Sequence, residues 1–199
     1  MALASYFYIY LEEEIRREAL VRRLGAFSRF WEAVCQQSGK LIGFRSLSQD
    51  VGVTHSTISS YFELLEETLL LERFDPVSTS QSRSRLIKSS KYCLFDMGIR
   101  RIGAREGVSL SREHMGHLFE HYVGLELRHL FRDRHQVKIK FWRDANGPEV
   151  DWVIDTGTHF IPISFFTRLC CVPNPTCVCL NRLNYRDSMV GTSSFKINR

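Results

Sequence analysis

The fold of this chain is decided by GHLFEHYVGLELRHLF at residues 116–131, KIKFWRDANGPEVDWVID at 138–155 and HFIPI at 159–163. In the first piece the apolar residues recur at helical spacing, which predicts a helix. In the second piece apolar and polar residues alternate on both sides of an Asn-Gly-Pro turn at 146–148, which predicts a β-hairpin. The third piece predicts a strand at 160–163 beside that hairpin. One helix and three strands are therefore expected here.

Two acidic residues fall inside these elements. Glu120 lies on the predicted helix, and Asp151 lies on the second strand among apolar neighbours. Burying a carboxylate costs free energy unless a metal, a polar partner or water compensates it. Glu120 and Asp151 are therefore the candidate site residues of this half of the chain.

A Glu on a helix, then a hairpin containing EVDWVI, then IPI resembles the core of nucleases of the PD-(D/E)xK type. The resemblance implies a restriction-endonuclease-like α/β domain in which the Glu and the Asp join a Glu-x-Lys on the next strand. Such carboxylates hold Mg²⁺, and the Lys positions a water for attack on a phosphodiester. Here Ser-Phe-Phe at 164–166 follows IPI, and these residues supply neither an anionic ligand nor an ammonium group. We therefore expect Glu120 and Asp151 to be vestigial, with at most a weak metal site and no intact catalytic site.

Composition bounds the remaining possibilities. The 199 residues suit one large or two small domains, and 44% hydrophobic with 25% charged residues is ordinary for a globular protein. A formal net charge of +5 permits nucleic-acid binding without requiring it. The first twenty residues lack the pattern of a secretory signal, and no apolar run approaches the ~20 residues of a membrane span. We expect a cytoplasmic protein with no membrane partner.

Clusters of cysteine and histidine are further candidates for metal sites. Four of the six cysteines, at 170, 171, 177 and 179, have the spacing CC-x5-C-x-C, which differs from the paired CxxC of zinc sites. We expect them to be free thiols in a poorly ordered tail. His114, His117 and His121 fall on one helical face. That face reads either as a metal cluster or as a surface stripe, and the lack of matching ligands elsewhere favours the stripe.

The first half of the chain reads as a helix-turn-helix. A helix at 25–35 should bury its aromatic residues, and a second at 44–51 should be capped by Ser46 and ended by Gly52. A longer helix should begin at Thr54. Its predicted buried residues are Ile58, Tyr61, Phe62, Leu64, Leu65, Leu69 and Leu70. Two helices joined by a turn that contains Gly are typical of this motif.

In a DNA-binding helix-turn-helix the early residues of the second helix approach the major groove. Here those residues are Thr54, His55, Ser56, Thr57 and Ser59. They are small and polar, but they include none of the Arg, Lys, Asn or Gln side chains that read bases in bidentate fashion. We therefore expect DNA binding of low sequence specificity.

A hairpin wing should follow, with strands at 71–74 and 91–95. The basic residues expected at its tip are Arg83, Arg85, Lys88 and Lys91. Such a tip can lie on phosphates, and each contact would add a salt-dependent contribution. The alternatives are a solvated loop and a loop that meets an acidic face of another domain.

A longer run of motifs resembles the C-terminal region of prokaryotic AAA-type ATPases known only as ATP-binding proteins. The motifs are YLEEEIRREALVRRLGAFSRF at 10–30, LSQDVGVTHSTISSYFELLEETLLLERFDP at 47–76, SSKYCLFDMGIRR at 89–101, and GHLFEHYVGLEL with FWRDANGPEVDWVID. In that family a P-loop ATPase core precedes a winged helix and a nuclease-like domain of unknown function. The resemblance implies a DNA-binding or assembly module whose partners are double-stranded DNA, an ATPase core or a second copy of the chain.

Two departures limit this resemblance. No G-x-x-x-x-G-K-[ST] occurs, so the ATPase P-loop is absent and ATP binding is not carried over. The match ends after Ile163, and residues 164–199 contain one Asp and no Glu. Our hypothesis is a frameshift that replaced the original ending and left a truncated gene product.

The sequence thus predicts an α+β protein with an N-terminal winged-helix unit and a truncated restriction-endonuclease-like domain. The expected segments are a helical lead-in at 1–37, a winged helix-turn-helix at 38–98, a partial nuclease-like domain at 99–163 and a divergent, disordered tail at 164–199. The expected function is that of a non-catalytic fragment of an ATP-binding protein, without a cofactor. One alternative is a metal-dependent nuclease with a substituted active site that uses Mg²⁺. The other is a pure protein–protein interaction domain.

Overall fold

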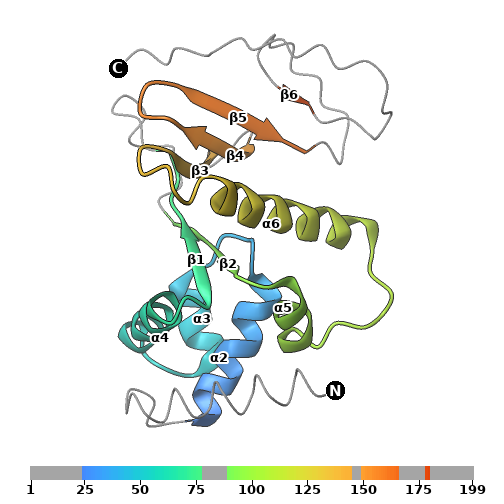
Figure 1. Ribbon diagram of the computed structural model, residues 1–199. Coiled ribbons are helices and arrows are strands. Elements are labelled where there is room, and N and C mark those ends of the chain that lie inside the picture. The colour runs from blue at the N-terminus through green and yellow to red at the C-terminus, as the bar shows by residue number, and fades with distance from the viewer. Residues whose placement is uncertain (1–23, 78–88, 145–148, 166–177, 180–199) are drawn as a thin grey trace. The chain divides into compact units, whose positions relative to one another are not determined.

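The computed structural model describes residues 24–77, 89–144, 149–165 and 178–179 (Figure 1). Helices and antiparallel sheets are both present, which confirms the expected α+β class. The described residues fall into two compact units. Unit 1 draws on Met1–Arg73 and Lys91–Leu110, and unit 2 on Phe74–Ser90 and Ser111–Arg199.

Unit 1 is a helix-turn-helix followed by a pair of short strands and a further helix. Its elements are α2 (Leu24–Gln37), α3 (Phe44–Val51), α4 (His55–Glu67), β1 (Leu71–Phe74), β2 (Lys91–Leu94) and α5 (Met97–Gly103). The strands β1 and β2 pair with each other, as the predicted wing requires. The expected domain boundary after residue 98 thus falls inside α5.

The core of unit 1 is aromatic. Phe27, Phe30 and Trp31 of α2 are buried, as their spacing predicted. The ring of Phe62 on α4 lies 5.2 Å from Phe30 and 4.4 Å from Tyr92 of β2, measured between ring centroids. These contacts hold α2, α4 and β2 around one centre, so the two helices of the motif have a fixed support.

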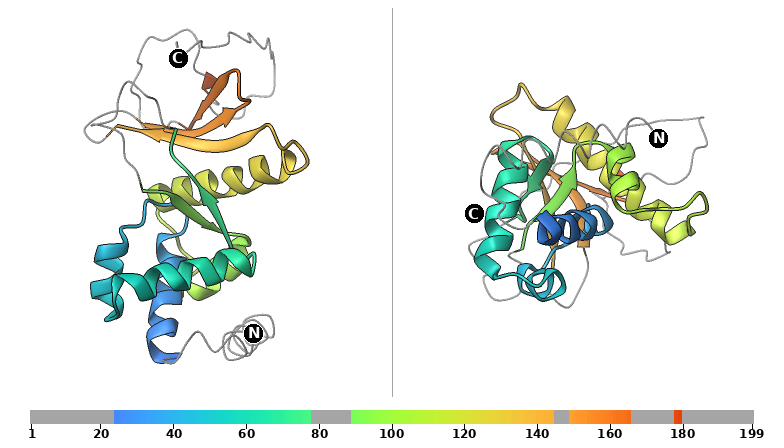
Figure 2. Two further views of the ribbon diagram at one scale, coloured as in Figure 1. Left: turned by 90° about the vertical axis from the view of Figure 1, so that its left-hand side faces the viewer. Right: turned by 90° about the horizontal axis from the view of Figure 1, so that it is seen from below.

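Unit 2 is a sheet with one long helix against it. Its elements are α6 (Arg112–Leu130), β3 (Lys138–Arg143), β4 (Glu149–Asp155), β5 (Phe160–Ser164) and β6 (Val178–Cys179). The strand order is β3-β4-β5-β6; the first three strands are antiparallel, and β6 pairs with β5 in parallel. Figure 2 shows α6 running beside this sheet. The predicted helix, hairpin and third strand are therefore confirmed.

The pairing of β3 with β4 contains a bulge. Lys140 opposes Val153, but Trp142 opposes Val150, so one residue of β3 faces two residues of β4. Those two residues are Asp151 and Trp152. A bulge redirects side chains locally, and this one lies at the strand acid that the sequence singled out.

Two expectations about local structure were wrong. Ser46 does not cap α3, because the helix begins at Phe44 with Gly43 as its N-cap, which places Ser46 inside the first turn. Leu69 is not buried: it has a positive φ of 59° in the turn after α4 and is 76% exposed. Of the expected tail at 164–199, the structure describes residues 164–165 and the strand β6; its other residues lie outside the described part of the chain, as does the lead-in at 1–23.

Candidate functional site

The first part of the candidate site is the N-terminus of α4. Helix α4 begins at His55, one residue later than predicted, and Thr54 is its N-cap, whose Oγ1 accepts a hydrogen bond of 3.2 Å from the Thr57 amide. The same oxygen lies 2.9 Å from Ser56 Oγ and 2.8 Å from Thr57 Oγ1. We call Thr54, Ser56 and Thr57 the hydroxyl cluster. Thr54, His55 and Ser56 are exposed, whereas Thr57 and Ser59 are half-buried.

The turn that precedes α4 is fixed from two sides. Gly52 ends α3 with a φ of 75°, a conformation that favours glycine, and its amide donates to Ser48 O at 3.0 Å. The guanidinium of Arg29 on α2 donates twice to Val51 O, at 3.2 and 2.9 Å. Arg29 thereby ties α2 to the end of α3. No sequence motif predicts this contact between Arg29 and the carbonyl of Val51.

Of the four basic residues predicted at the wing tip, the structure describes only Lys91. Arg83, Arg85 and Lys88 lie outside the described residues. Lys91 is the first residue of β2, is bridged to Leu41 and is 6% exposed. The expectation that Lys91 lies at an exposed tip is therefore wrong, because the strand that carries it belongs to the buried part of unit 1.

Separate hydrogen bonds hold the two acidic residues of unit 2, one to the main chain of Glu120 and one to the side chain of Asp151. Glu120 on α6 and Asp151 on β4 are both half-buried. The indole Nε1 of Trp152 donates to Glu120 O at 2.9 Å, and the Phe165 amide donates to Asp151 Oδ2 at 2.7 Å. Phe165 also packs its ring 5.1 Å from that of Phe119 on α6. The residues that replace the expected Glu-x-Lys thus supply a main-chain donor and an apolar ring beside Asp151.

Among the described residues, no third His, Cys, Asp or Glu side chain joins Glu120 and Asp151 in a metal-binding group. Mg²⁺ is held by carboxylates and other oxygen ligands in near-octahedral geometry. Within the described ranges, no group of three or more His, Cys, Asp or Glu side chains is placed to hold a metal ion. One oxygen of Asp151 is already engaged by the Phe165 amide.

The histidines of α6 do not share one exposed face. His117 is exposed and His114 is half-buried, but His121 is 1% exposed. His121 lies with Gly124 on the buried side of the helix. The expectation of a surface stripe is therefore wrong for His121, because its position is used for packing.

Cysteines and apolar segments add no further candidate among the described residues. Cys35 and Cys93 are free and buried, and burial raises the pKa of the Cys35 thiol, although the nearby charge of Arg100 opposes the shift. Cys170, Cys171 and Cys177 lie outside the described residues, and Cys179 belongs to β6. In the part of the chain that the structure describes, no helix has the length and apolar character needed to cross a bilayer.

Comparison with known proteins finds two families. A family described as Domain of unknown function (DUF8612) matches residues 1–107, which is just over half of the chain. A second, described as Domain of unknown function (DUF4143), matches residues 115–165, which include both Glu120 and Asp151. No curated protein and no solved structure matches the chain.

Proposed function

The chain belongs to the family described as Domain of unknown function (DUF8612), and on that premise we propose that it is a non-catalytic module that binds double-stranded DNA with low sequence specificity. The observation that carries this proposal is the exposed start of α4 within a helix-turn-helix. There the hydroxyl cluster surrounds the first turn of the second helix.

The chemistry of this helix start suits a phosphate. The first-turn amides of a helix point outward and carry partial positive charge, which attracts anions. Hydroxyl groups donate to phosphate oxygens and, being small, let the backbone come close. None of Thr54, His55, Ser56, Thr57 or Ser59 offers bidentate base readout, so position on the duplex would be set mainly by phosphates.

The non-catalytic part of the proposal rests on unit 2. The side chains that follow IPI are Ser164 and Phe165, and the amide of Phe165 occupies Asp151 Oδ2. A metal-dependent nuclease would need a carboxylate and a Lys from elsewhere in the chain. The resemblance to AAA-type ATP-binding proteins further suggests an ATPase core or a second copy of the chain as an assembly partner.

Fluorescence anisotropy with a mixed-sequence DNA duplex tests the binding site. Ser56→Glu places a carboxylate on the proposed phosphate contact and should raise the Kd about tenfold, equivalent to roughly 1.4 kcal/mol. Ser109→Glu makes the same charge change at an exposed position of unit 1 outside the helix-turn-helix, and it should leave the Kd unchanged. A wild-type affinity that does not respond to salt would exclude phosphate binding.

A cleavage assay tests the non-catalytic part separately. Plasmid DNA is incubated with the full chain and Mg²⁺ or Mn²⁺, beside the Asp151→Ala variant. We expect no cleavage above background from either protein. Metal-dependent cleavage by the wild type that disappears in Asp151→Ala would establish the nuclease alternative instead.

A further inference from the structure

One segment of unit 2 carries a large excess of basic residues. Residues 128–143 contain six Arg and Lys side chains and one Asp, a net of +5. The whole chain has 27 Arg and Lys against 22 Asp and Glu, also a net of +5. The remaining residues therefore balance, with 21 side chains of each sign. We call 128–143 the basic segment; it comprises the end of α6, the turn after it and β3.

Three of these six cations form an ion pair or lie over a buried ring. Lys140 Nζ lies 2.8 Å from Asp155 Oδ2, and Arg143 lies 3.1 Å from Glu149. The guanidinium of Arg128 lies over the ring of Phe74, 4.6 Å from its centroid. Structural roles account for these three side chains.

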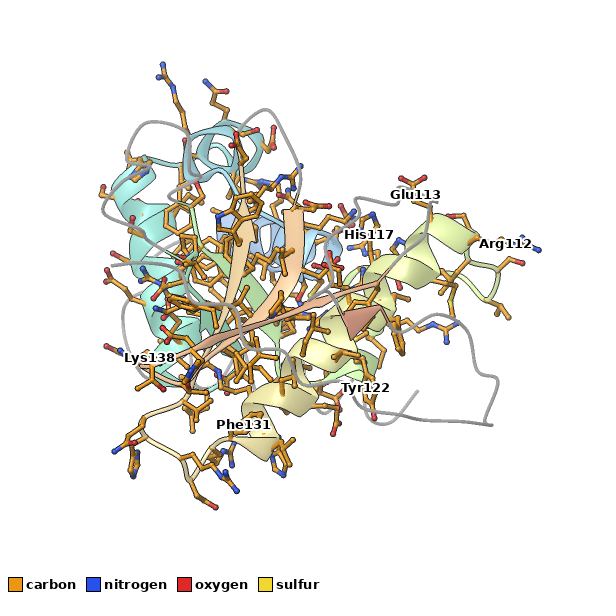
Figure 3. All side chains as sticks on the ribbon, turned by 90° about the horizontal axis from the view of Figure 1, so that it is seen from above. Arg112, Glu113, His117, Tyr122, Phe131 and Lys138 are labelled. Carbon is orange, nitrogen blue, oxygen red and sulfur yellow. The ribbon has the colours of Figure 1, made fainter. Side chains whose placement is uncertain are left out.

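The other three cations, Arg132, Arg134 and Lys138, are exposed. Among the described residues no carboxylate lies within ion-pair distance of any of them. Asp155 opposes Lys138 in the strand register, but its two oxygens are engaged by Lys140 Nζ and by the Gly157 amide. Figure 3 shows Phe131 and Lys138 toward the same end of α6.

Complementing the helix dipole does not explain these three side chains. Basic residues in the last turn of a helix interact favourably with its C-terminal carbonyls, and Arg128 and His129 occupy that turn of α6. Arg132, Arg134 and Lys138 come after Phe131, the C-cap residue. The dipole effect falls off within the last turn, so it gives no reason for three further unpaired cations within seven residues.

We infer that Arg132, Arg134 and Lys138 form a second, sequence-independent contact surface for the phosphate backbone of nucleic acid. Guanidinium groups match phosphate oxygens in bidentate geometry. Arg134 also lies over Phe131, 5.9 Å from the ring centroid. Anionic membranes are usually recognised by larger clusters of four to eight basic residues. The inference goes beyond the proposed function, since this surface is on unit 2 and the α4 site is on unit 1.

The test is a triple variant of the full chain, Arg132→Gln, Arg134→Gln and Lys138→Gln. Binding to a mixed-sequence duplex is measured by anisotropy between about 50 and 200 mM salt. We expect the Kd to rise at least tenfold at low salt. Each phosphate contact contributes roughly 0.9 to the slope of log affinity against log salt, so the slope should fall by about 2 to 3.

The matched control is Arg101→Gln, Arg105→Gln and Arg112→Gln. These three arginines are exposed and lie outside the basic segment. Substituting them removes the same total charge as the first triple variant does. Their substitution should leave the Kd within about twofold of the wild type. An equal loss of affinity in both triple variants, or no loss in the first, would overturn the inference. Circular dichroism verifies that both variants are folded.

Two more outcomes separate this surface from its alternatives. If Ser56→Glu has no effect on duplex binding while the triple variant of the basic segment weakens it, the α4 proposal fails and the inference stands. If Ser56→Glu weakens duplex binding while that triple variant has no effect, the inference alone fails. Phosphatidylserine vesicles are tested in parallel. Vesicle binding that needs the three basic residues, without duplex binding, would identify a membrane surface and overturn the assignment to nucleic acid.

Discussion

The indole Nε1 of Trp152 donates a 2.9 Å hydrogen bond to the main-chain carbonyl of Glu120 and so joins β4 to α6. Trp152 is fully buried, and Gly124, one turn further along α6, is the residue that makes room for its ring. The helix and the strand that carry the two candidate acids are thus positioned by an aromatic residue. Neither acid needs to bind a ligand for this arrangement to hold.

Replacing the indole tests that relationship. Trp152→Phe removes the donor to Glu120 O and part of a fully buried side chain, so it should lower the free energy of unfolding by about 1–3 kcal/mol. Urea unfolding followed by circular dichroism measures the change. Trp142→Phe, at a half-buried position of β3, should cost clearly less. Equal losses of stability in the two variants would show that the hydrogen bond to Glu120 does not add measurably to stability.

For Gly124→Ala, the sign of the change in stability is the test. In a helix, Ala is normally more stable than Gly by about 1 kcal/mol. Here an added Cβ would overlap Trp152 Cζ2, so the substitution should instead destabilise by about 1–3 kcal/mol. Gly25→Ala on α2 is the control, because the nearest atom to a Cβ built there is Arg29 Nη1, at 4.0 Å. A higher Tm for Gly124→Ala would contradict the close approach.

The N-cap of α4 can be tested against the cap that the sequence suggested for α3. Thr54→Ala removes the acceptor of the Thr57 amide and should cost about 0.5–2 kcal/mol. Thr54→Ser retains that acceptor and should recover most of the loss. Ser46→Ala should change stability by less than about 0.5 kcal/mol, since Ser46 does not cap α3. A larger effect at position 46 would favour the original assignment.

Asp155 predicts a specific dependence on pH. Desolvation raises the pKa of its carboxyl, but hydrogen bonds from Lys140 and the Gly157 amide outweigh it and hold the pKa below its usual range. A depressed carboxyl pKa stabilises the fold above the unfolded-state pKa, about 3.9, and this contribution is lost as pH falls through the folded-state pKa. The stability difference between the wild type and Lys140→Met should therefore be constant from about pH 7 to 5 and shrink below about pH 4.

Urea unfolding at successive pH values measures this difference. Lys138→Met is the control, because Lys138 also lies near Asp155 but makes no ion pair with it. Its stability difference from the wild type should vary less with pH. A difference for Lys140→Met that grows on acidification would show that the sign assigned to Asp155 is wrong.

The elements that the sequence predicted well depend on short-range chemistry. Thr54 caps α4 and Gly52 ends α3 because these residue types suit those backbone positions whatever surrounds them. The hairpin of β3 and β4 follows from alternation on both sides of its turn. The α+β class followed from these local signals.

The features that the sequence analysis missed depend on contacts between distant residues. His121 has helical neighbours that suggest an exposed face, yet packing buries it. Helix α5 was not predicted, because Gly98 and Gly103 near its two ends are typical of turns. Asp96 caps this helix by accepting a 2.8 Å hydrogen bond from the Ile99 amide. Likewise, the Phe165 amide reaches Asp151 only through the pairing of β4 with β5.

The discontinuous boundary of the units has a practical consequence for dissecting the gene. The two family matches divide the chain between residues 107 and 115, which invites an expression clone that stops there. Such a clone would retain Phe74–Ser90, a piece of unit 2. In the intact protein Val77 donates from its amide to Phe141 O, and Phe74 packs its ring 4.7 Å from Trp152. Dividing the chain at that point would separate Phe74 from Trp152 and Val77 from Phe141. Neither half would therefore correspond to one complete unit.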